Sequence, residues 1–256
     1  TTINSTALTM VYKGGKYLAS KSLKPIIYSK YSNDRSEKYM IATDILRRGE
    51  KKIVRKRAVN QEAVSHVLAM KKHCEGLEKL VKDTNFKIDP IVDEGKDYLD
   101  FEYIEGIGFE QYLDDIYMKS GLDGLVDYVN VFFEQLDKIA NVSFSDNEKF
   151  GYYFGNGEIL EGYPSISVGD IDLVFQNIII DDEGKWNIID YEWTVDCCIP
   201  VKLLKYRALL LYIYGQSHRN NLINNNLFRI FGISNEEKNT FSMMEEHFQK
   251  IIKDNH

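Results

Sequence analysis

Residues 169–193 read GDIDLVFQNIIIDDEGKWNIIDYEW, and this stretch predicts the fold more strongly than any other part of the chain. Asp172 and Asn177 stand five residues apart, just before an isoleucine run that is typical of a buried strand. The Asp-Glu-Gly sequence that follows favours a tight turn, after which a second strand runs back along the first. We therefore expect a hairpin that returns Asp190 to a position beside Asn177.

Three polar side chains of this segment suit the transfer of a phosphoryl group from ATP. Asn177 and Asp190 offer amide and carboxylate oxygens, which are the ligands that Mg²⁺ prefers. Asp172, one short loop away, is left to orient or deprotonate an attacking hydroxyl. Taken singly, each residue is more often a turn or cap residue. Their joint spacing favours catalysis by Asp172 and magnesium binding by Asn177 and Asp190.

The motif D-x-x-x-x-N, followed by a hairpin and by I-D-Y-E, resembles the catalytic segment of protein-kinase-like phosphotransferases. The Asp-aromatic-Glu ending looks closer to choline, aminoglycoside and sugar kinases than to protein kinases, which carry Asp-Phe-Gly. The run DYEWTVDCCIPVKLLKYRALLLY at 190–212 resembles the kinase domains of bacterial surface-polysaccharide enzymes, including those that cap the O-antigen chains of lipopolysaccharide. The order of the motifs extends the resemblance over about residues 26–215.

The resemblance implies an α+β, two-lobed protein-kinase-like fold. Residues 1–24 are expected to form an N-terminal extension or linker, 25–104 a small β-rich lobe with one main helix, and 105–256 a mainly helical lobe. Local patterns agree with this order. They predict strands at 26–31, 38–46, 51–58, 88–92 and 98–104, a helix after an N-cap at Asn60 through about 79, and helices at 109–119, 124–140, 201–214, 220–231 and 236–253.

Lys56 is the candidate for the lysine that contacts nucleotide phosphates, because it lies on the third strand, where the resembling kinases carry theirs. Arg55 and Arg57 alternate with it, so only one face of the strand can present Lys56 to a ligand. A basic strand that faces solvent is the plainer interpretation of this segment alone. The resemblance also implies a helix carboxylate that holds the lysine, and Glu75 is preferred to Glu62 by its distance along the chain.

The connection between the first two strands is expected to cover the nucleotide phosphates. Its sequence at 32–36, SNDRS, lacks the usual glycines, yet Ser32, Asn33 and Arg35 have groups that can contact phosphate oxygens. The alternative interpretation of this loop is an ordinary polar turn.

The stretch 101–106, FEYIEG, resembles the kinase hinge that hydrogen-bonds adenine through its backbone. Glu102, Tyr103 and Ile104 would then contact the base, and Phe101 would limit the depth of its pocket. Without the resemblance, the same pattern is more often simply the end of a strand.

Composition bounds the remaining possibilities. The net charge of −7 argues against nucleic acid as the main partner, because phosphate binding depends on clustered Lys and Arg. No apolar run approaches the roughly 20 residues that span a bilayer, and the start shows no secretory signal. The three cysteines form neither a disulfide framework nor a zinc pattern. A cytoplasmic protein is expected, with peripheral association at the inner face of the membrane left open.

The sequence therefore predicts an ATP- and magnesium-dependent kinase that phosphorylates a hydroxyl of a glycan, such as a cell-surface polysaccharide or lipopolysaccharide sugar, or of a related small molecule. Choline- or aminoglycoside-type acceptors are the alternative within the same enzyme class. The alternative from another class is a pseudokinase, a binding module without catalysis. It is motivated by Asp170, which stands where the resembling kinases often carry His. The absence of an initial Met also leaves open that the chain is part of a larger polysaccharide-modifying enzyme.

Trp193, Glu192 and three tyrosines complete the expectations from the sequence. Trp193 is expected to pack in the core, while the role of Glu192 stays undecided between metal contact and loop support. Tyr206, Tyr212 and Tyr214 recur at helical spacing, which favours core packing over stacking on a sugar.

Overall fold

The computed structural model describes residues 12–13, 16–17 and 26–253. The chain divides into two compact units: a first unit of Thr1–Leu68 with Pro90–Tyr103, and a second unit of Ala69–Asp89 with Ile104–His256. Most of the predicted extension at 1–24 lies outside the described residues. Within it, β1 (Tyr12–Lys13) and β2 (Lys16–Tyr17) pair antiparallel.

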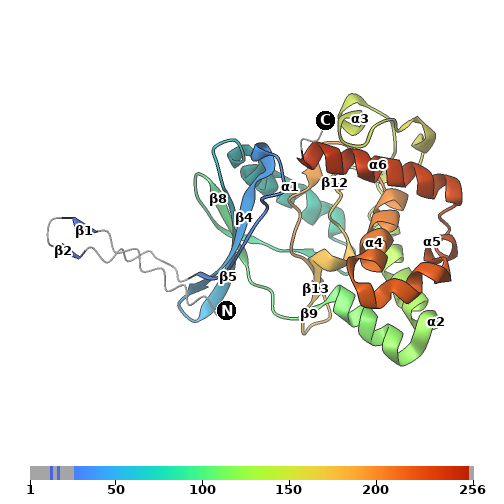
Figure 1. The fold of residues 1–256 in the computed structure, drawn as a ribbon, viewed down its shortest axis with the longest axis horizontal. Coiled ribbons are helices and arrows are strands. Elements are labelled where there is room, and N and C mark those ends of the chain that lie inside the picture. Colours follow the sequence, from blue (N-terminus) through green and yellow to red (C-terminus); the bar gives the residue numbers. More distant parts are fainter. Residues whose placement is uncertain (1–11, 14–15, 18–25, 254–256) are drawn as a thin grey trace. The chain divides into compact units, whose positions relative to one another are not determined.

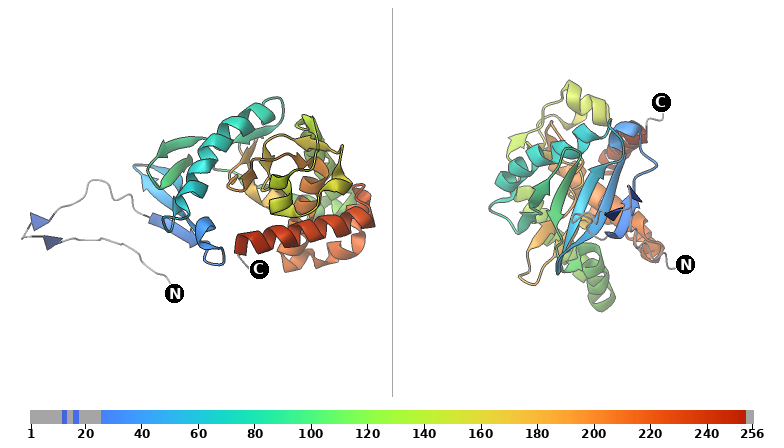
Figure 2. Two further views of the ribbon diagram at one scale, coloured as in Figure 1. Left: turned by 90° about the horizontal axis from the view of Figure 1, so that it is seen from above. Right: turned by 90° about the vertical axis from the view of Figure 1, so that its left-hand side faces the viewer.

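The first unit is built on a five-stranded antiparallel sheet with the order β3-β4-β5-β8-β7. Figures 1 and 2 show these strands side by side in one twisted layer. Their bounds are β3 (Ile26–Tyr31), β4 (Ile41–Arg48), β5 (Lys51–Ala58), β7 (Ile91–Glu94) and β8 (Tyr98–Glu102). The predicted start of the second strand at 38 is wrong, because Glu37–Tyr39 form a short 3-10 turn before β4.

The main helix of the N-terminal half is α1 (Val64–Val81), which begins in the first unit and ends in the second. Its buried residues recur every three or four positions, at Val67, Met70, Cys74 and Leu77, as expected for a helix with one apolar face. The Asn60 side chain accepts a hydrogen bond from the Ala63 N–H at 2.9 Å, which is the predicted capping role.

The single strand predicted at 88–92 is wrong. The structure has two strands there, β6 (Phe86–Ile88) and β7, separated by Asp89 and Pro90. Proline has no N–H to continue a ladder, and the chain changes partner at this point. β6 runs parallel to β14 (Trp186–Ile188), whereas β7 pairs with β8. Residues 69–89 therefore belong to the second unit, although they precede the predicted lobe boundary at 104.

Helices dominate the second unit (Figure 1). They are α2 (Phe109–Lys138), α3 (Glu148–Phe154), α4 (Val201–Gly215), α5 (Leu227–Ile230) and α6 (Asn235–Lys253). Gly121 has φ 66°, a value that favours glycine, and it interrupts α2 between the two helices predicted for this stretch. The helix predicted at 220–231 is instead a 3-10 segment, Ser217–Asn225, followed by the short α5. α6 packs against α3 and α4.

Short sheets link these helices. β9 (Ile107–Gly108), β13 (Ile178–Ile180), β14 and β6 form one sheet in the order β6-β14-β13-β9. β10 (Val142–Ser143), β11 (Pro164–Ile166) and β16 (Ile199–Pro200) form another, and β12 (Gly169–Asp170) pairs with β15 (Thr194–Val195). The predicted α+β class, with a β-rich N-terminal part and a helical C-terminal part, is confirmed. No described helix is long and apolar enough to cross a membrane.

The core of the second unit is a cluster of aromatic rings centred on Phe132, which is completely buried. The Phe132 ring centroid lies 4.8 Å from Phe175, 5.1 Å from Phe109, 5.3 Å from Phe86 and 5.7 Å from Trp186. Phe175 belongs to the loop between Asp172 and Asn177, so the same cluster that fills the core also anchors that loop.

Candidate functional site

The predicted hairpin is present, and it places the two ends of the motif side by side. Ile178 pairs with Ile188 in the β13–β14 ladder, and the Ile189 N–H donates to the Asn177 carbonyl oxygen at 3.0 Å. Asp190 therefore follows directly on a residue that is hydrogen-bonded to Asn177. The expectation that the hairpin returns Asp190 to Asn177 is confirmed as a feature of the fold.

Two side chains hold the backbone of Asp172. The Asp172 N–H donates to Oδ1 of Asp170 at 3.0 Å, and Nδ2 of Asn177 donates to the Asp172 carbonyl oxygen at 3.0 Å. Asp170 is completely buried. The sequence left open how this loop is braced without the His that the resembling kinases often carry, and the structure shows that Asp170 itself provides a contact.

Negative charge is concentrated around this loop. Burial, followed by the charge of Asp172, raises the pKa of Asp170 well above its usual value, and Asp190 adds to the effect while Arg207 opposes it. The second oxygen of Asp170, Oδ2, is buried and has no hydrogen-bond partner among the described residues. A buried carboxyl group in this environment favours its neutral form unless a cation lies beside it, and its second oxygen lacks the partner that a buried polar atom requires.

The hairpin offers oxygen donors of the kind that magnesium takes. Among the described residues, no group of three or more His, Cys, Asp or Glu side chains could hold a metal ion. Mg²⁺ is commonly bound by one or two protein oxygens together with water and substrate phosphates. The carboxylate of Asp190 and the amide oxygen of Asn177 therefore fit the predicted role.

Arg207 is a site residue that sequence reasoning missed. It lies on α4 and is 5% exposed. Its Nη2 atom is 3.3 Å from Oδ1 of Asp172, and its Nη1 atom donates to Oε2 of Glu245 on α6. Burial alone would lower the pKa of Arg207, but Glu245 and Asp172 raise it. A single arginine in the apolar run YRALLLY was the available signal, because a buried charge requires partners.

In the first unit, Lys56 lies on one face of β5, and Arg55 and Arg57 lie on the other, as strand alternation predicted. Lys56 is 2% exposed and lies between Thr43 of β4 and Leu99 of β8 in the ladder. On the other face, Arg55 pairs with Asp100 at 2.6 Å and Arg57 with Asp44 at 2.8 Å. The solvent-facing interpretation of Lys56 is therefore wrong, while its contact with nucleotide phosphates stays a prediction.

The loop predicted to cover phosphates contains one hydroxyl that the sequence reasoning passed over. Ser32 is engaged in the hairpin, since its N–H and its hydroxyl both donate to the Ile41 carbonyl oxygen. Asn33 is exposed and Arg35 half-buried. The Ser36 hydroxyl is buried and has no partner among the described residues. Phosphate contacts by Ser32, Asn33 and Arg35 stay predictions.

The remaining predicted nucleotide residues lie at the end of β8 and on α1. The Glu102 N–H donates to the Pro90 carbonyl oxygen at 3.3 Å, and the Lys52 ammonium lies 4.6 Å from the Tyr103 ring centroid. Ile104 is the first residue of the segment that returns to the second unit. Glu75 is exposed, on the side of α1 away from its buried residues. Adenine contacts by residues 102–104 and the pairing of Glu75 with Lys56 stay predictions.

A cavity of about 370 Å³ lies beside the loop that carries Asp172 and Asn177. Gln176 of that loop lines it, together with Glu110 and Asp114 of α2 and with Gln216, His218 and Arg219, which follow α4. This cavity is subsequently called the loop cavity. Side-chain amides and carboxylates at a concave surface can bind hydroxyl groups through hydrogen bonds.

The charges of the loop cavity are largely paired. Arg219 is 4% exposed and contacts Glu110 at 2.9 Å and Asp114 at 2.8 Å. The hydroxyl of Tyr212 also donates to Asp114, at 2.8 Å. Burial, partly offset by Arg219, raises the pKa of Glu110 above its usual value. The cavity therefore presents a network of paired charges rather than free carboxylates.

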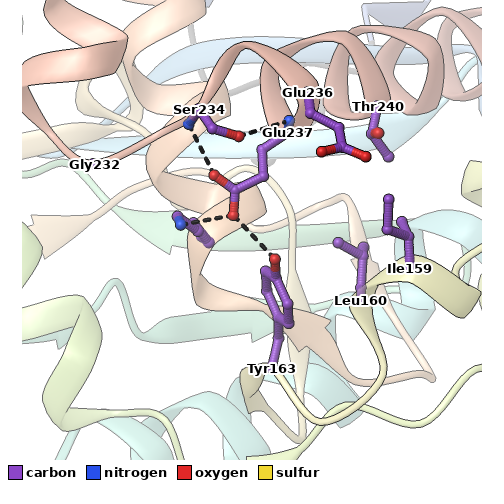
Figure 3. Close-up of a pocket in the computed structure, with 9 residues that line it drawn as sticks. Ile159, Leu160, Tyr163, Gly232, Ser234, Glu236, Glu237 and Thr240 are labelled. Atoms are coloured by element: carbon purple, nitrogen blue, oxygen red, sulfur yellow. Dashed lines mark hydrogen bonds and ion pairs between the residues drawn. The ribbon is translucent and has the colours of Figure 1, made fainter.

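A second cavity of about 470 Å³ lies at the start of α6 (Figure 3). Glu237 dominates its polar lining. Its carboxylate accepts hydrogen bonds from the Ser234 N–H, the Tyr163 hydroxyl and the Lys202 ammonium, while the Ser234 hydroxyl accepts one from the Glu237 N–H. This reciprocal pair is a capping box, which satisfies the first N–H groups of a helix. The carboxylate of Glu237 is therefore already engaged in structural hydrogen bonds with its neighbours in this cavity.

The capping box predicts a pH-dependent stability. Burial would raise the pKa of Glu237, but the hydrogen bonds from Lys202, the Ser234 N–H and Tyr163 lower it from 4.5 to about 2. A lowered folded pKa stabilises the protein above pH 4.5, and the stabilisation is lost as the pH falls toward 2. Glu237→Gln is expected to remove a contribution of up to roughly 3 kcal/mol at neutral pH. Urea unfolding at a series of pH values measures it.

The control for this variant is Glu236→Gln, because Glu236 lies in the same helical turn but is exposed. It is expected to unfold with the pH profile of the unmodified chain. If Glu237→Gln and Glu236→Gln lose the same free energy of unfolding as the pH falls from 4.5 toward 2, the capping box does not carry this contribution.

Comparisons with known proteins bear on the fold. No protein-family model matches the sequence, and no curated protein matches it. Among solved structures, the chain is similar to the ADP-bound aminoglycoside phosphotransferase APH(2'')-Ib, with 13% identity, 88% of this chain and 95% of that chain covered, and a TM-score of 0.44. It is similar to choline kinase LicA from Streptococcus pneumoniae, with 13% identity, 82% and 79% coverage, and a TM-score of 0.47. It is also similar to the PknI kinase domain of M. tuberculosis, with 10% identity, 83% and 92% coverage, and a TM-score of 0.38.

Proposed function

We propose that this protein is an ATP-dependent phosphotransferase that phosphorylates a hydroxyl group of a small molecule or glycan. The observation that carries the proposal is the braced loop and hairpin of the second unit. Asp172 is held through both its N–H and its carbonyl oxygen, and the hairpin ladder brings Asp190 to Asn177. This arrangement supports one carboxylate that acts on a hydroxyl and two oxygen donors for a cation.

In the proposed reaction, Asp172 accepts a hydrogen bond from the acceptor hydroxyl and takes its proton. The hydroxyl oxygen forms a bond to the γ-phosphorus, and the bond from that phosphorus to the β–γ bridging oxygen breaks, which releases ADP. Asp190 and Asn177 would hold Mg²⁺, which neutralises charge on the transferring phosphoryl group. Asp170 keeps the loop backbone in place, and Arg207 fixes one oxygen of Asp172.

The loop cavity supports a neutral, polyhydroxylated acceptor such as a sugar unit of a glycan. It lies beside Gln176, within the loop that carries Asp172. A polycationic acceptor would need unpaired carboxylates, but Arg219 already engages both Glu110 and Asp114. Hydroxyl groups can exchange hydrogen bonds with such a network without carrying an opposite charge. The acceptor class is therefore proposed as a neutral sugar in preference to a polycationic aminoglycoside.

Phosphoryl transfer to matched acceptors tests the proposal. ADP release would be measured with neutral hexoses and oligosaccharides, with the corresponding amino sugars and with choline, and the products identified by phosphorus NMR. Acceptor-dependent release with the neutral sugars is expected. Release with only the cationic acceptors would contradict the acceptor class. ATP binding without transfer to any acceptor would favour the binding-module alternative.

A further inference from the structure

The contact between the buried Arg207 and Asp172 raises the question of what holds the side chain of the proposed catalytic residue. Arg207 lies on α4, 35 residues after Asp172 in the sequence. Its guanidinium nevertheless contacts the carboxylate that is proposed to be catalytic. We propose that Arg207 is a positioning residue that, together with Glu245 of α6, fixes the side chain of Asp172 for phosphoryl transfer. The inference rests on the proposed function and concerns the same site.

The backbone and the side chain of Asp172 are held by different residues. Asp170 and Asn177 bind only its N–H and its carbonyl oxygen. These two contacts act on the backbone and do not by themselves fix the carboxylate. Arg207 contacts Oδ1 at 3.3 Å, which restricts rotation of the carboxylate about its side-chain bonds. Precise orientation matters because a small misplacement of a reacting group can cost about a hundredfold in rate.

Arg207 is itself fixed by a chain of contacts from α6. Gln249 donates to Oε1 of Glu245 at 2.8 Å, and Glu245 accepts a hydrogen bond from Nη1 of Arg207. The guanidinium carbon also lies 5.2 Å from the centroid of the Phe248 ring. An arginine held by both Glu245 and Phe248 has little freedom to move, so its contact with Asp172 has a defined direction.

A buried guanidinium needs compensation, and one carboxylate would neutralise it. Glu245 already supplies that charge, so stability alone does not require Asp172 as a second partner. Asp172 instead gains a neighbouring cation within a cluster that also contains Asp170 and Asp190. Arg207 is therefore placed to favour one orientation of Asp172 against repulsion from the other carboxylates.

The test compares Arg207→Met and Arg207→Lys with Lys205→Met. Lys205 lies on the same helix and pairs with Asp137 at 2.7 Å, so the control also removes an ion pair from α4. For folded protein, Arg207→Met is expected to lower kcat by about tenfold to a hundredfold, with the dissociation constant for ATP changed by less than about twofold. Arg207→Lys is expected to recover part of the lost kcat, because it restores a cation near Oδ1.

Glu245→Gln keeps the arginine and removes only its second partner, so it tests the inference if Arg207→Met does not fold. It is expected to lower kcat by about threefold to tenfold, because Arg207 loses part of its support. If kcat of Arg207→Met stays within twofold of kcat of Lys205→Met, Arg207 is not a positioning residue. If Arg207→Met does not fold, the same comparison between Glu245→Gln and Lys205→Met decides the question. If the unmodified protein transfers no phosphate to any acceptor, the proposed function fails instead, which is a separate result.

Discussion

Replacement of Asp172 by asparagine is expected to lower kcat about a thousandfold, because a neutral amide cannot accept the proton of the acceptor hydroxyl. The two groups that hold the loop, Asp170 and Asn177, contact only backbone atoms of residue 172. The substitution therefore leaves these contacts in place. Affinity for ATP is expected to stay within about threefold, since Asp172 acts on the acceptor rather than on the nucleotide.

Steady-state ADP release and calorimetric ATP binding measure these two quantities for Asp172→Asn. Asp182→Asn is the matched control, because Asp182 lies on the exposed turn of the same hairpin segment. It removes one negative charge nearby in sequence and is expected to keep the full rate. An Asp172→Asn variant that transfers phosphate at the unmodified rate would remove Asp172 from its proposed role.

Replacement of Phe132 by alanine is expected to cost about 3–5 kcal/mol of unfolding free energy, the range for truncation of a buried aromatic side chain. The Phe132 ring is completely buried and contacts Phe109, Phe175 and Trp186, which come from a helix, the loop and the hairpin. The cavity left behind would remove packing from all three elements at once.

Urea unfolding measures this cost, with Val131→Ala as the control. Val131 is the neighbouring residue on α2 but is 41% exposed, so its truncation is expected to cost well under about 1 kcal/mol. Equal destabilisation of the two variants would contradict the central place of Phe132 in this core.

The hairpin was predictable because its information is local. An isoleucine run, a turn containing glycine and a second apolar run follow one another within 169–193, and the register Ile178 with Ile188 follows from the turn between them. Lys56 was separable from Arg55 and Arg57 for the same reason, since strand alternation is also a local rule. Trp193 is buried and lies 5.3 Å from the Phe248 ring, as its core assignment predicted.

What the sequence did not reveal depends on pairing between distant segments. The parallel pairing of β6 with β14 joins residues about 100 positions apart, and it assigns 69–89 to the second unit. The contact of Arg207 with Glu245 spans 38 positions. Among the tyrosines predicted to fill the core, Tyr206 and Tyr212 are buried, but Tyr214 is 54% exposed. Tyr214 follows Tyr212 by two residues, about 200° around a helix, so it lies on the opposite face, while Tyr212 and Ile213 of the same last turn are buried.

Asp170 has a buried Oδ2 atom without a hydrogen-bond partner among the described residues, and Asp190 is proposed to bind Mg²⁺. Both indicate that a cation binds together with the nucleotide, which is the central claim about this site. Calorimetric titration of ATP with and without magnesium, on the unmodified chain and on Asp190→Asn, tests it most directly. We expect ATP binding that requires magnesium and that is lost in Asp190→Asn. Binding that is the same with and without magnesium, or that survives unchanged in Asp190→Asn, would contradict the account.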